Sequence, residues 1–272
     1  MIILKSEEIA NRNLDAATLS QAKTLFETDG FLKIENLFEK ELIQLLASDL
    51  MENLSIENDA LTRGTRIHNR RYIVSVALKP PFNQPELYAN SILLSLMKEF
   101  LGPHYILGSI GAVISLPGAP DQHIHSDYEP LFKEQPELRG VLPPYAITVG
   151  IPLIDIDLLN GPTKIWAGSH RVPSPDAKNF PRHLLCGPVG SCYFWDYRTL
   201  HAGGSNHSEQ MRPLLYLAYT RRWFKDYLNP DLLLIEEEIP EEHRHLFPIQ
   251  QLKYAEAETD FKAKVSALFG PA

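Results

Sequence analysis

The stretch SCYFWDYRTLHAGGSNHSEQMRPLLYLAYT, residues 191–220, contains two short apolar runs joined by a segment rich in Gly, Ser and Asn. Aromatic and branched residues favour strands, whereas Gly, Ser and Asn favour turns, so the stretch is typical of strand–turn–strand. Similar runs, each followed by a turn signal, occur at 105–115, 145–154 and 163–168. Many short strands at this spacing indicate a sandwich or barrel. We therefore predict a mainly β fold with a double-stranded β-helix (jelly-roll, cupin-like) core over 105–223.

Helices are expected to flank this core. Residues 1–104 have the spacing of amphipathic helices, and 224–272 form an acidic C-terminal extension, so we expect a single domain over 1–272. The expected elements of the N-terminal part are a helix capped by Thr18 or Ser20 that ends near Gly30, a strand over 31–34, and helices over 39–54 and roughly 86–101.

The composition narrows the class of protein. The chain has 272 residues, 44% apolar and 22% charged, which suits a domain with a substantial core. Its formal net charge of -8 argues against a nucleic-acid partner, because phosphate contacts need clustered Lys and Arg. The N-terminal apolar run is too short for a signal peptide or a membrane span, and Cys186 and Cys192 are expected to be reduced. We expect a cytoplasmic protein with no membrane partner, and the sequence leaves its oligomeric state open.

Four potential metal ligands occupy alternate positions in DQHIHSDYEP, residues 121–130: His123, His125, Asp127 and Glu129. Alternate side chains of an extended chain point the same way. A mononuclear iron site takes two His and one carboxylate on one face of its octahedron, which leaves positions open for a cosubstrate and O₂. The His-x-Asp spacing of His125 and Asp127 suits two of these ligands, and the third would be a His from a distant strand.

His201 and Arg212 follow in the order that such a site requires. An arginine facing a barrel interior would be a costly buried charge without an anionic partner. The far carboxylate of 2-oxoglutarate would be such a partner, because it fits the guanidinium fork. A core histidine and an exposed turn arginine are the plain structural explanations of His201 and Arg212 taken singly. Their joint order after His-x-Asp favours a site for a metal and a dicarboxylate.

Three segments resemble the phytanoyl-CoA dioxygenase family of Fe(II)/2-oxoglutarate-dependent oxygenases: QHIHSD (122–127), NGPTKIWAGSHR (160–171) and HAGGSNHSEQMR (201–212). A looser likeness in FLKIENLF (31–38) extends the resemblance to roughly residues 18–222. It implies an oxidoreductase that needs Fe(II), 2-oxoglutarate and O₂ and acts on a small molecule. Gln in the first segment and Thr in the second are similar to members that modify natural products, which implies secondary metabolism.

The resemblance also implies roles for six residues. For iron and catalysis they are His125, Asp127 and His201, and for 2-oxoglutarate they are Arg212, Gln122 and Thr163. Gly203 departs from the family, which often has Ser there, and this leaves one cosubstrate contact open. Asp127 argues against halogenation, because the family's halogenases carry Ala or Gly at that position.

A cupin-type metalloenzyme that needs no 2-oxoglutarate is the alternative. It would use His123, His125 and Glu129, spaced as HxHxxxE, together with His201. This alternative gives no reason for Arg212.

The reaction that the resemblance implies is oxidation of a C–H bond of a small organic molecule, with release of succinate and CO₂. Hydroxylation is the simplest outcome, and desaturation, epoxidation and rearrangement are alternatives. The segment 136–144 is expected to be a loop that covers the pocket. The residues expected near the substrate are Arg66, His68, Asn69, Arg70, Tyr72, Phe132 and Trp223, whose arginines would favour an anionic or polar substrate.

Overall fold

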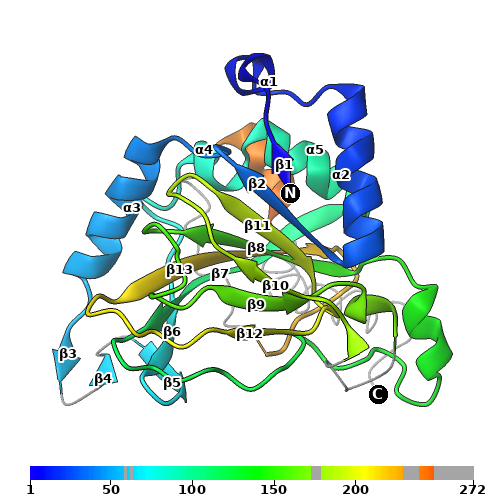
Figure 1. The fold of residues 1–272 in the computed structure, drawn as a ribbon. Helices are drawn as coiled ribbons and strands as arrows, with labels where there is room; N and C mark the ends of the chain where they lie inside the picture. Colours follow the sequence, from blue (N-terminus) through cyan, green and yellow to red (C-terminus); the bar gives the residue numbers. More distant parts are fainter. Residues whose placement is uncertain (58–59, 62–63, 173–178, 229–238, 248–272) are drawn as a thin grey trace, which may run out of the picture.

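Two β-sheets form the centre of the computed structural model, which describes residues 1–57, 60–61, 64–172, 179–228 and 239–247 (Figure 1). The large sheet has eight strands in the order β1-β2-β11-β8-β13-β7-β6-β5, and the small sheet has the order β10-β9-β12. The large-sheet strands are β1 (Ile2–Ile3), β2 (Phe31–Glu35), β5 (Gly64–His68), β6 (Arg71–Ser75), β7 (Tyr105–Ser115), β8 (Ala146–Pro152), β11 (Cys192–Asp196) and β13 (Arg212–Arg221). The small-sheet strands are β9 (Thr163–Trp166), β10 (Arg182–Leu185) and β12 (His201–Gly203), and a separate pair joins β3 (Ile56–Glu57) to β4 (Ala60–Leu61). The predicted mainly β, jelly-roll core is confirmed.

Strand alternation divides the large sheet into two faces. On β7, β8 and β13 one set of alternate residues, among them Ile114, Val149 and Leu217, belongs to the main apolar core. The intervening residues, among them Val113 and Tyr216, line a cavity on the other face. Because successive side chains of a strand point to opposite faces, the same strands build both the core and the cavity wall.

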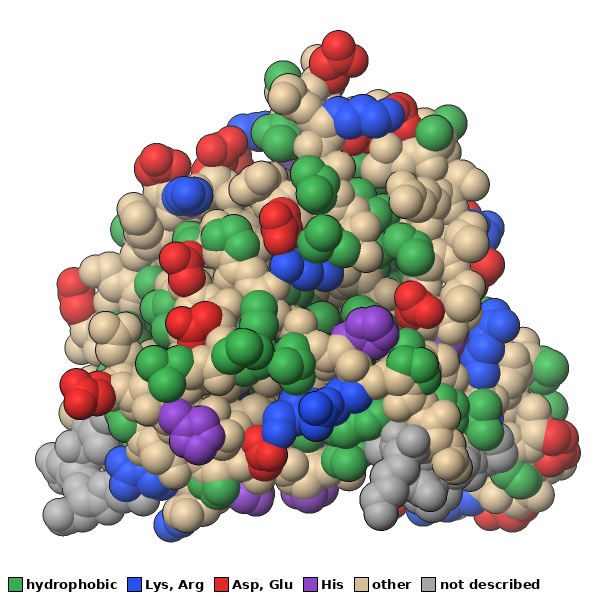
Figure 2. Space-filling view, viewed as in Figure 1, with side chains coloured by type: hydrophobic (Ala, Val, Ile, Leu, Met, Phe, Trp, Pro, Cys, Tyr) green, Lys and Arg blue, Asp and Glu red, His purple; other side chains and the backbone are tan. Residues whose placement is uncertain are grey.

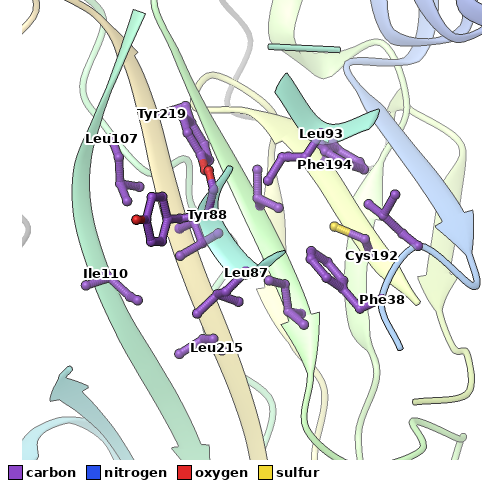
Figure 3. Close-up of a cluster of buried hydrophobic side chains, with 14 of the residues drawn as sticks. Phe38, Leu87, Tyr88, Leu93, Leu107, Ile110, Cys192, Phe194, Leu215 and Tyr219 are labelled. Carbon is purple, nitrogen blue, oxygen red and sulfur yellow. The ribbon is translucent and has the colours of Figure 1, made fainter. Parts of the chain in front are cut away.

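The helices cover the core-facing side of the large sheet (Figure 1). They are α1 (Ser6–Asn11), α2 (Ala16–Asp29), α3 (Lys40–Glu52), α4 (Pro85–Tyr88) and α5 (Ser91–Leu101). In the core beneath them, Leu87 and Tyr88 lie among Ile110, Leu215 and Tyr219 of the sheet (Figure 3). The stacked rings of Phe26 and Phe100, with centroids 4.2 Å apart, join α2 to α5. This apolar layer holds the large sheet in place beneath the helices.

The sequence predicted the strand over 31–34 and the helix over 39–54, and the structure confirms both as β2 and α3. The cap of the first long helix was predicted wrongly. Its N-cap is Asp15, whose Oδ1 accepts from the backbone N–H of Thr18 at 2.7 Å. Thr18 instead supplies the amide that is capped.

Two further predictions for the N-terminal part need correction. The helix expected over 86–101 is divided into α4 and α5, because Asn90 between them caps α5. The segment 64–75, which was expected within a mostly helical part, forms the β5–β6 hairpin and continues the large sheet beyond β7. The predicted loop over 136–144 begins with the 3₁₀ helix η1 (Pro136–Gly140).

Replacing Asn90 with Ala should lower the free energy of unfolding by about 1 kcal/mol, the usual effect of losing an N-cap acceptor. Asn90 Oδ1 accepts from the backbone N–H groups of Ile92 and Leu93 at 3.0 and 3.2 Å. Urea unfolding measures the change, and the Asn90→Asp variant, which retains an acceptor, is the matched control. Equal losses in both variants would contradict a capping role.

The surface, the cysteines and the C-terminal extension complete the description of the fold. Acidic and basic side chains are interspersed over the face seen in Figure 2. Within the described ranges, no helix combines the length and apolar character needed to cross a bilayer. Cys186 and Cys192 are unpaired. In the predicted C-terminal extension, the 3₁₀ helix η5 (Glu241–Leu246) is described, whereas 229–238 and 248–272 lie outside the described residues.

Candidate metal centre

His125, Asp127 and His201 come together in the wall of the cavity between the two sheets. One ligand atom from each residue lies within 4.8 Å of the others, which is close enough for a single ion to contact all three. His201 belongs to β12 of the small sheet, whereas His125 and Asp127 lie in the segment after β7. Two imidazoles and one carboxylate are the donor set of a mononuclear non-haem iron site.

The main chain holds the two histidine-bearing segments against each other. The N–H of His125 donates to the carbonyl of His201 at 3.0 Å, and the N–H of His201 donates to the carbonyl of His125 at 2.8 Å. The N–H of Asp127 donates to the carbonyl of Tyr197 at 2.9 Å. The separation of the three side chains is thus fixed by backbone hydrogen bonds as well as by packing.

Hydrogen bonds also orient both imidazole rings. Nδ1 of His125 lies 2.8 Å from the carbonyl of His123, and Nδ1 of His201 lies 3.0 Å from the carbonyl of Thr199. A carbonyl can only accept, so each Nδ1 carries a proton and each Nε2 is left as the metal-binding atom. Burial, followed by the neighbouring His201, lowers the pKa of His125 to about 4, which keeps this ring neutral and able to bind a metal at neutral pH.

Two donors hold the carboxylate of Asp127. Its Oδ2 accepts from Thr148 Oγ1 at 2.6 Å and from Trp195 Nε1 at 2.8 Å. Its Oδ1 lies 3.3 Å from His201 Nε2. Burial alone would raise the pKa of Asp127, but His201 and the hydrogen bond from Thr148 outweigh it and hold the pKa below its ordinary value. Oδ1 is therefore ionised and positioned beside the imidazole nitrogens.

Replacing Trp195 with Phe should weaken metal binding by about 10- to 100-fold, the usual effect of removing a group that orients a ligand. The substitution removes the indole N–H that holds Asp127 Oδ2 and retains an aromatic ring at a fully buried position. Anaerobic Fe(II) titration measures the change. Phe194→Leu is the control, because the side chain of Phe194 lies in the core on the opposite face of β11. An unchanged affinity in the Trp195 variant would contradict this role.

A cavity of about 160 Å³ lies next to the three residues. Gln122 and Thr163, the two residues predicted to contact the cosubstrate, are among its lining residues. Gln122 Oε1 accepts from the N–H of Gly203 at 3.1 Å, and Thr163 pairs with Gly203 in the small sheet. Both side chains thus occupy the wall on the small-sheet side of the cavity.

Arg212 stands at the start of β13, on the same face of the strand as Tyr216 of the cavity wall, and is 1% exposed. Its Nε has no hydrogen-bond partner among the described residues, and its neighbours include the phenol of Tyr216, which lines the cavity. A buried guanidinium with an unsatisfied donor calls for an anion. Together with the His-Asp-His donor set, this unsatisfied arginine fits a site for iron and a dicarboxylate.

The structure does not bring Glu129 into the metal centre. Its carboxylate is exposed and pairs with Lys133. The ring of His123 is next to His125, with centroids 5.1 Å apart, but the side chain of His123 is exposed. The cupin-type set of ligands therefore lacks its carboxylate.

The residues predicted near the substrate are mostly elsewhere. Within the β5–β6 hairpin the cavity is lined by Ile67 and Ile73, whereas Arg66 is exposed and Tyr72 is buried. His68, Asn69 and Arg70 are not among the lining residues. Trp223 is 67% exposed, and Phe132 lines a second cavity, of about 300 Å³, formed with η1. The arginines of this segment thus give no support for an anionic substrate.

Sequence reasoning missed Thr148, Trp195 and Tyr216. All three lie on the cavity face of the large sheet and connect the metal centre to Arg212. Trp195 holds Asp127, its ring lies 5.7 Å from that of Tyr216, and Tyr216 lies beside Arg212. The alternation along each strand shows which of its residues share a face. Only the pairing of β8, β11 and β13 shows that Thr148, Trp195 and Tyr216 lie close together.

Known proteins share this sequence pattern and fold. The family model "Phytanoyl-CoA dioxygenase (PhyH)" matches residues 26–214. An ectoine dioxygenase of Bordetella parapertussis is 25% identical over 256 residues, covering 79% of each chain, and the dioxygenase FrzG of Cladobotryum sp is 23% identical over 230 residues, covering 72% of each. The crystal structure of the epimerase SnoN with Fe³⁺, α-ketoglutarate and nogalamycin RO has a TM-score of 0.59 at 16% identity, covering 83% of this chain and 99% of that one.

The family match spans more than half of the chain and includes each of the segments that carry the resemblance. The three metal-binding side chains that it requires are present and grouped in the structure. The chain belongs to the phytanoyl-CoA dioxygenase family of Fe(II)- and 2-oxoglutarate-dependent dioxygenases.

Proposed function

We propose that His125, Asp127 and His201 hold one Fe(II), and that Arg212 binds the far carboxylate of 2-oxoglutarate. The observation that carries this proposal is the unsatisfied Nε of buried Arg212, connected to the ligand Asp127 through Trp195 and Tyr216. A cation at one end of the site and a His-Asp-His set at the other match a dicarboxylate whose 2-oxo acid end reaches a metal.

Gln122 and Thr163 are proposed as polar contacts to the same cosubstrate from the small-sheet wall. Both line the cavity, and the Gln122 carbonyl oxygen is held by the N–H of Gly203, which leaves the amide NH₂ of Gln122 to donate. A neutral amide and a hydroxyl orient a carboxylate without adding charge. Their substitution should therefore affect cosubstrate affinity less than the loss of Arg212.

The protein's own contribution is to position the metal and the cosubstrate and to exclude water from the site. The bound metal and cosubstrate supply the oxidation of a C–H bond, coupled to decarboxylation of 2-oxoglutarate to succinate and CO₂. The rings of His125 and His201 present Nε2 to the metal position, and Thr148 and Trp195 hold the carboxylate of Asp127 in place. The apolar wall restricts the access of water to the reacting centre.

We further propose that the substrate is a small organic molecule of secondary metabolism. An uncharged part of it would enter the cavity, and a C–H bond of that part would be hydroxylated. Ile67, Ile73 and Val113 form part of the wall, and Asp127 is the one carboxylate among the described lining residues, with no Lys or Arg among them. A charged group placed there would lose hydration without gaining a partner. The relation in fold to an enzyme of nogalamycin biosynthesis supports a natural product as the substrate.

Anaerobic titration of the Fe(II)-loaded protein with 2-oxoglutarate tests the function. A chelated 2-oxo acid gives a weak visible charge-transfer band, which we expect to appear in the wild type and to be absent in His201→Ala. Aerobic succinate release then allows a screen of uncharged substrates. Iron binding without the band would refute the proposed use of 2-oxoglutarate, and failure to bind iron would refute the metal centre.

A further inference from the structure

A second arginine, Arg71, is buried beside Arg212. Arg71 is 0% exposed and Arg212 is 1% exposed. Both pair with Ser115 in the large sheet, Arg71 from β6 and Arg212 from β13, so the two arginines flank this serine on neighbouring strands. Residues paired across strands point to the same face.

That face is the one that forms the cavity. Two positions further along the strands, the pair Ile73 and Val113 lines the cavity wall. The guanidinium of Arg71 extends to the small sheet, because a Cβ added at Gly203 would lie 3.2 Å from Arg71 Cζ and 3.0 Å from Gln122 Oε1. The missing side chain at Gly203 thus leaves the space that Arg71 and Gln122 occupy. Gly203 itself lines the cavity.

The hydrogen bonds of Arg71 are made to neutral groups. Its Nη1 donates to the carbonyl of Pro120 at 3.1 Å, and its Nη2 donates to the carbonyl of Gly204 at 2.8 Å and to Ser115 Oγ at 3.2 Å. Its Nε has no partner among the described residues, like the Nε of Arg212. A guanidinium has five N–H donors, so both arginines retain donors for a ligand.

Within the described part of the chain, neither arginine forms an ion pair with a carboxylate. Asp121 attracts Arg71 from a distance, but its carboxylate binds Lys164 and the N–H of Ser205. Burial, followed by the charge of Arg212, lowers the pKa of Arg71 to about 10, so Arg71 remains charged at neutral pH. Arginine side chains are in general not deprotonated in proteins. Two neighbouring buried cations without a counter-ion are costly, and an anion between them would offset that cost.

We propose that Arg71 is a second cosubstrate-binding residue, which joins Arg212 in holding the far carboxylate of 2-oxoglutarate. This inference rests on the proposed function, because it assigns another contact to the same cosubstrate. The two guanidiniums place two positive charges where the far carboxylate would bind, which selects a 2-oxo acid with a second carboxylate over one with an apolar end.

A purely structural role for Arg71 makes a different prediction. Arg71 also connects Pro120, ahead of His125, to Gly204, just after His201. If Arg71 only held these two segments together, its loss would disturb the metal centre and weaken the binding of every 2-oxo acid to the same extent. A contact to the far carboxylate affects only ligands that carry this group.

The test compares 2-oxoglutarate with 2-oxopentanoate, which has the same five-carbon chain but a methyl group in place of the far carboxylate. Dissociation constants are measured anaerobically on Fe(II)-loaded protein by the charge-transfer band. Arg71→Gln should weaken the binding of 2-oxoglutarate by about 30-fold or more, since it removes one partner of a buried charge pair. The binding of 2-oxopentanoate should be unchanged. Arg66→Gln, at the exposed arginine of the same hairpin, should leave both ligands unchanged.

Equal weakening of both ligands in Arg71→Gln, or no weakening of either, would overturn the proposal while the proposed function stands. A wild type that binds iron but neither ligand would overturn both. If far-UV circular dichroism shows that Arg71→Gln does not fold, Arg71→Lys is used instead. Lysine keeps the positive charge but lacks the bidentate guanidinium, so the binding of 2-oxoglutarate should still be weakened more than that of 2-oxopentanoate.

Discussion

The Asp127→Ala variant should lose turnover completely and bind Fe(II) more than about 100-fold more weakly, because the loss of a mere orienting partner of a ligand already costs about 10- to 100-fold. The substitution removes the one carboxylate of the metal centre and leaves Thr148 and Trp195 without their acceptor. Anaerobic metal titration and succinate release measure the two effects. Full activity in this variant would contradict the ligand assignment.

Glu129→Ala is the matched control for this result. Glu129 lies two residues after Asp127, but its carboxylate is exposed and pairs with Lys133. Its loss should leave metal affinity unchanged, since surface ion pairs contribute little. A cupin-type enzyme would give the reverse result, with Glu129 required and Asp127 dispensable.

The Arg212→Leu variant should weaken 2-oxoglutarate binding by about 2–5 kcal/mol, which is the usual cost of removing one partner of a buried, hydrogen-bonded charge pair. Arg212 is 1% exposed, and its Nε is unsatisfied among the described residues. The half-saturating concentration of 2-oxoglutarate in the succinate assay should rise accordingly, while Fe(II) affinity stays at the wild-type value.

Arg182→Gln serves as the control for Arg212, because Arg182 is exposed on β10. An unchanged requirement for 2-oxoglutarate in Arg212→Leu would place the dicarboxylate elsewhere. A loss of Fe(II) affinity in this variant would instead indicate that Arg212 supports the structure of the metal centre.

The sequence allowed the metal centre to be predicted because its ligands carry a local signal. His125 and Asp127 stand two residues apart, and their spacing shows that they share a face. Turn residues follow His201 and precede Arg212, and they mark the ends of the two strands that carry these residues. The order of these residues along the chain was therefore informative before any pairing of strands was known.

The β5–β6 hairpin could not be predicted in the same way. Most residues of GTRIHNRRY (64–72), which forms the greater part of it, are charged or polar. The hairpin also contains a bulge between Arg66 and His68 and a left-handed residue, Arg70, with φ of 54°. Strand propensity is weak in such a segment, so its pairing with β7 comes from tertiary contacts. Arg71 was overlooked for the same reason, because among several arginines only the strand register shows which one is buried.

The helix boundaries illustrate a smaller difficulty. Apolar residues continue at helical spacing from 87 to 101, so the pattern alone does not show the break at Asn90. Likewise, Asp15, Thr18 and Ser20 are all residue types that cap helices, and only the observed bond to Thr18 N–H identifies Asp15. The sequence shows which residues could cap a helix, but the structure is needed to identify the one that does.

The paired backbone hydrogen bonds between His125 and His201 have a consequence for how the enzyme matures. Many small metal sites assemble only when the ion arrives, so metal binding and folding are one event. Here main-chain hydrogen bonds between the two segments hold them together without the ion. Folding and iron loading are therefore separable, and the chain can persist as a folded apoprotein that exchanges its metal without unfolding.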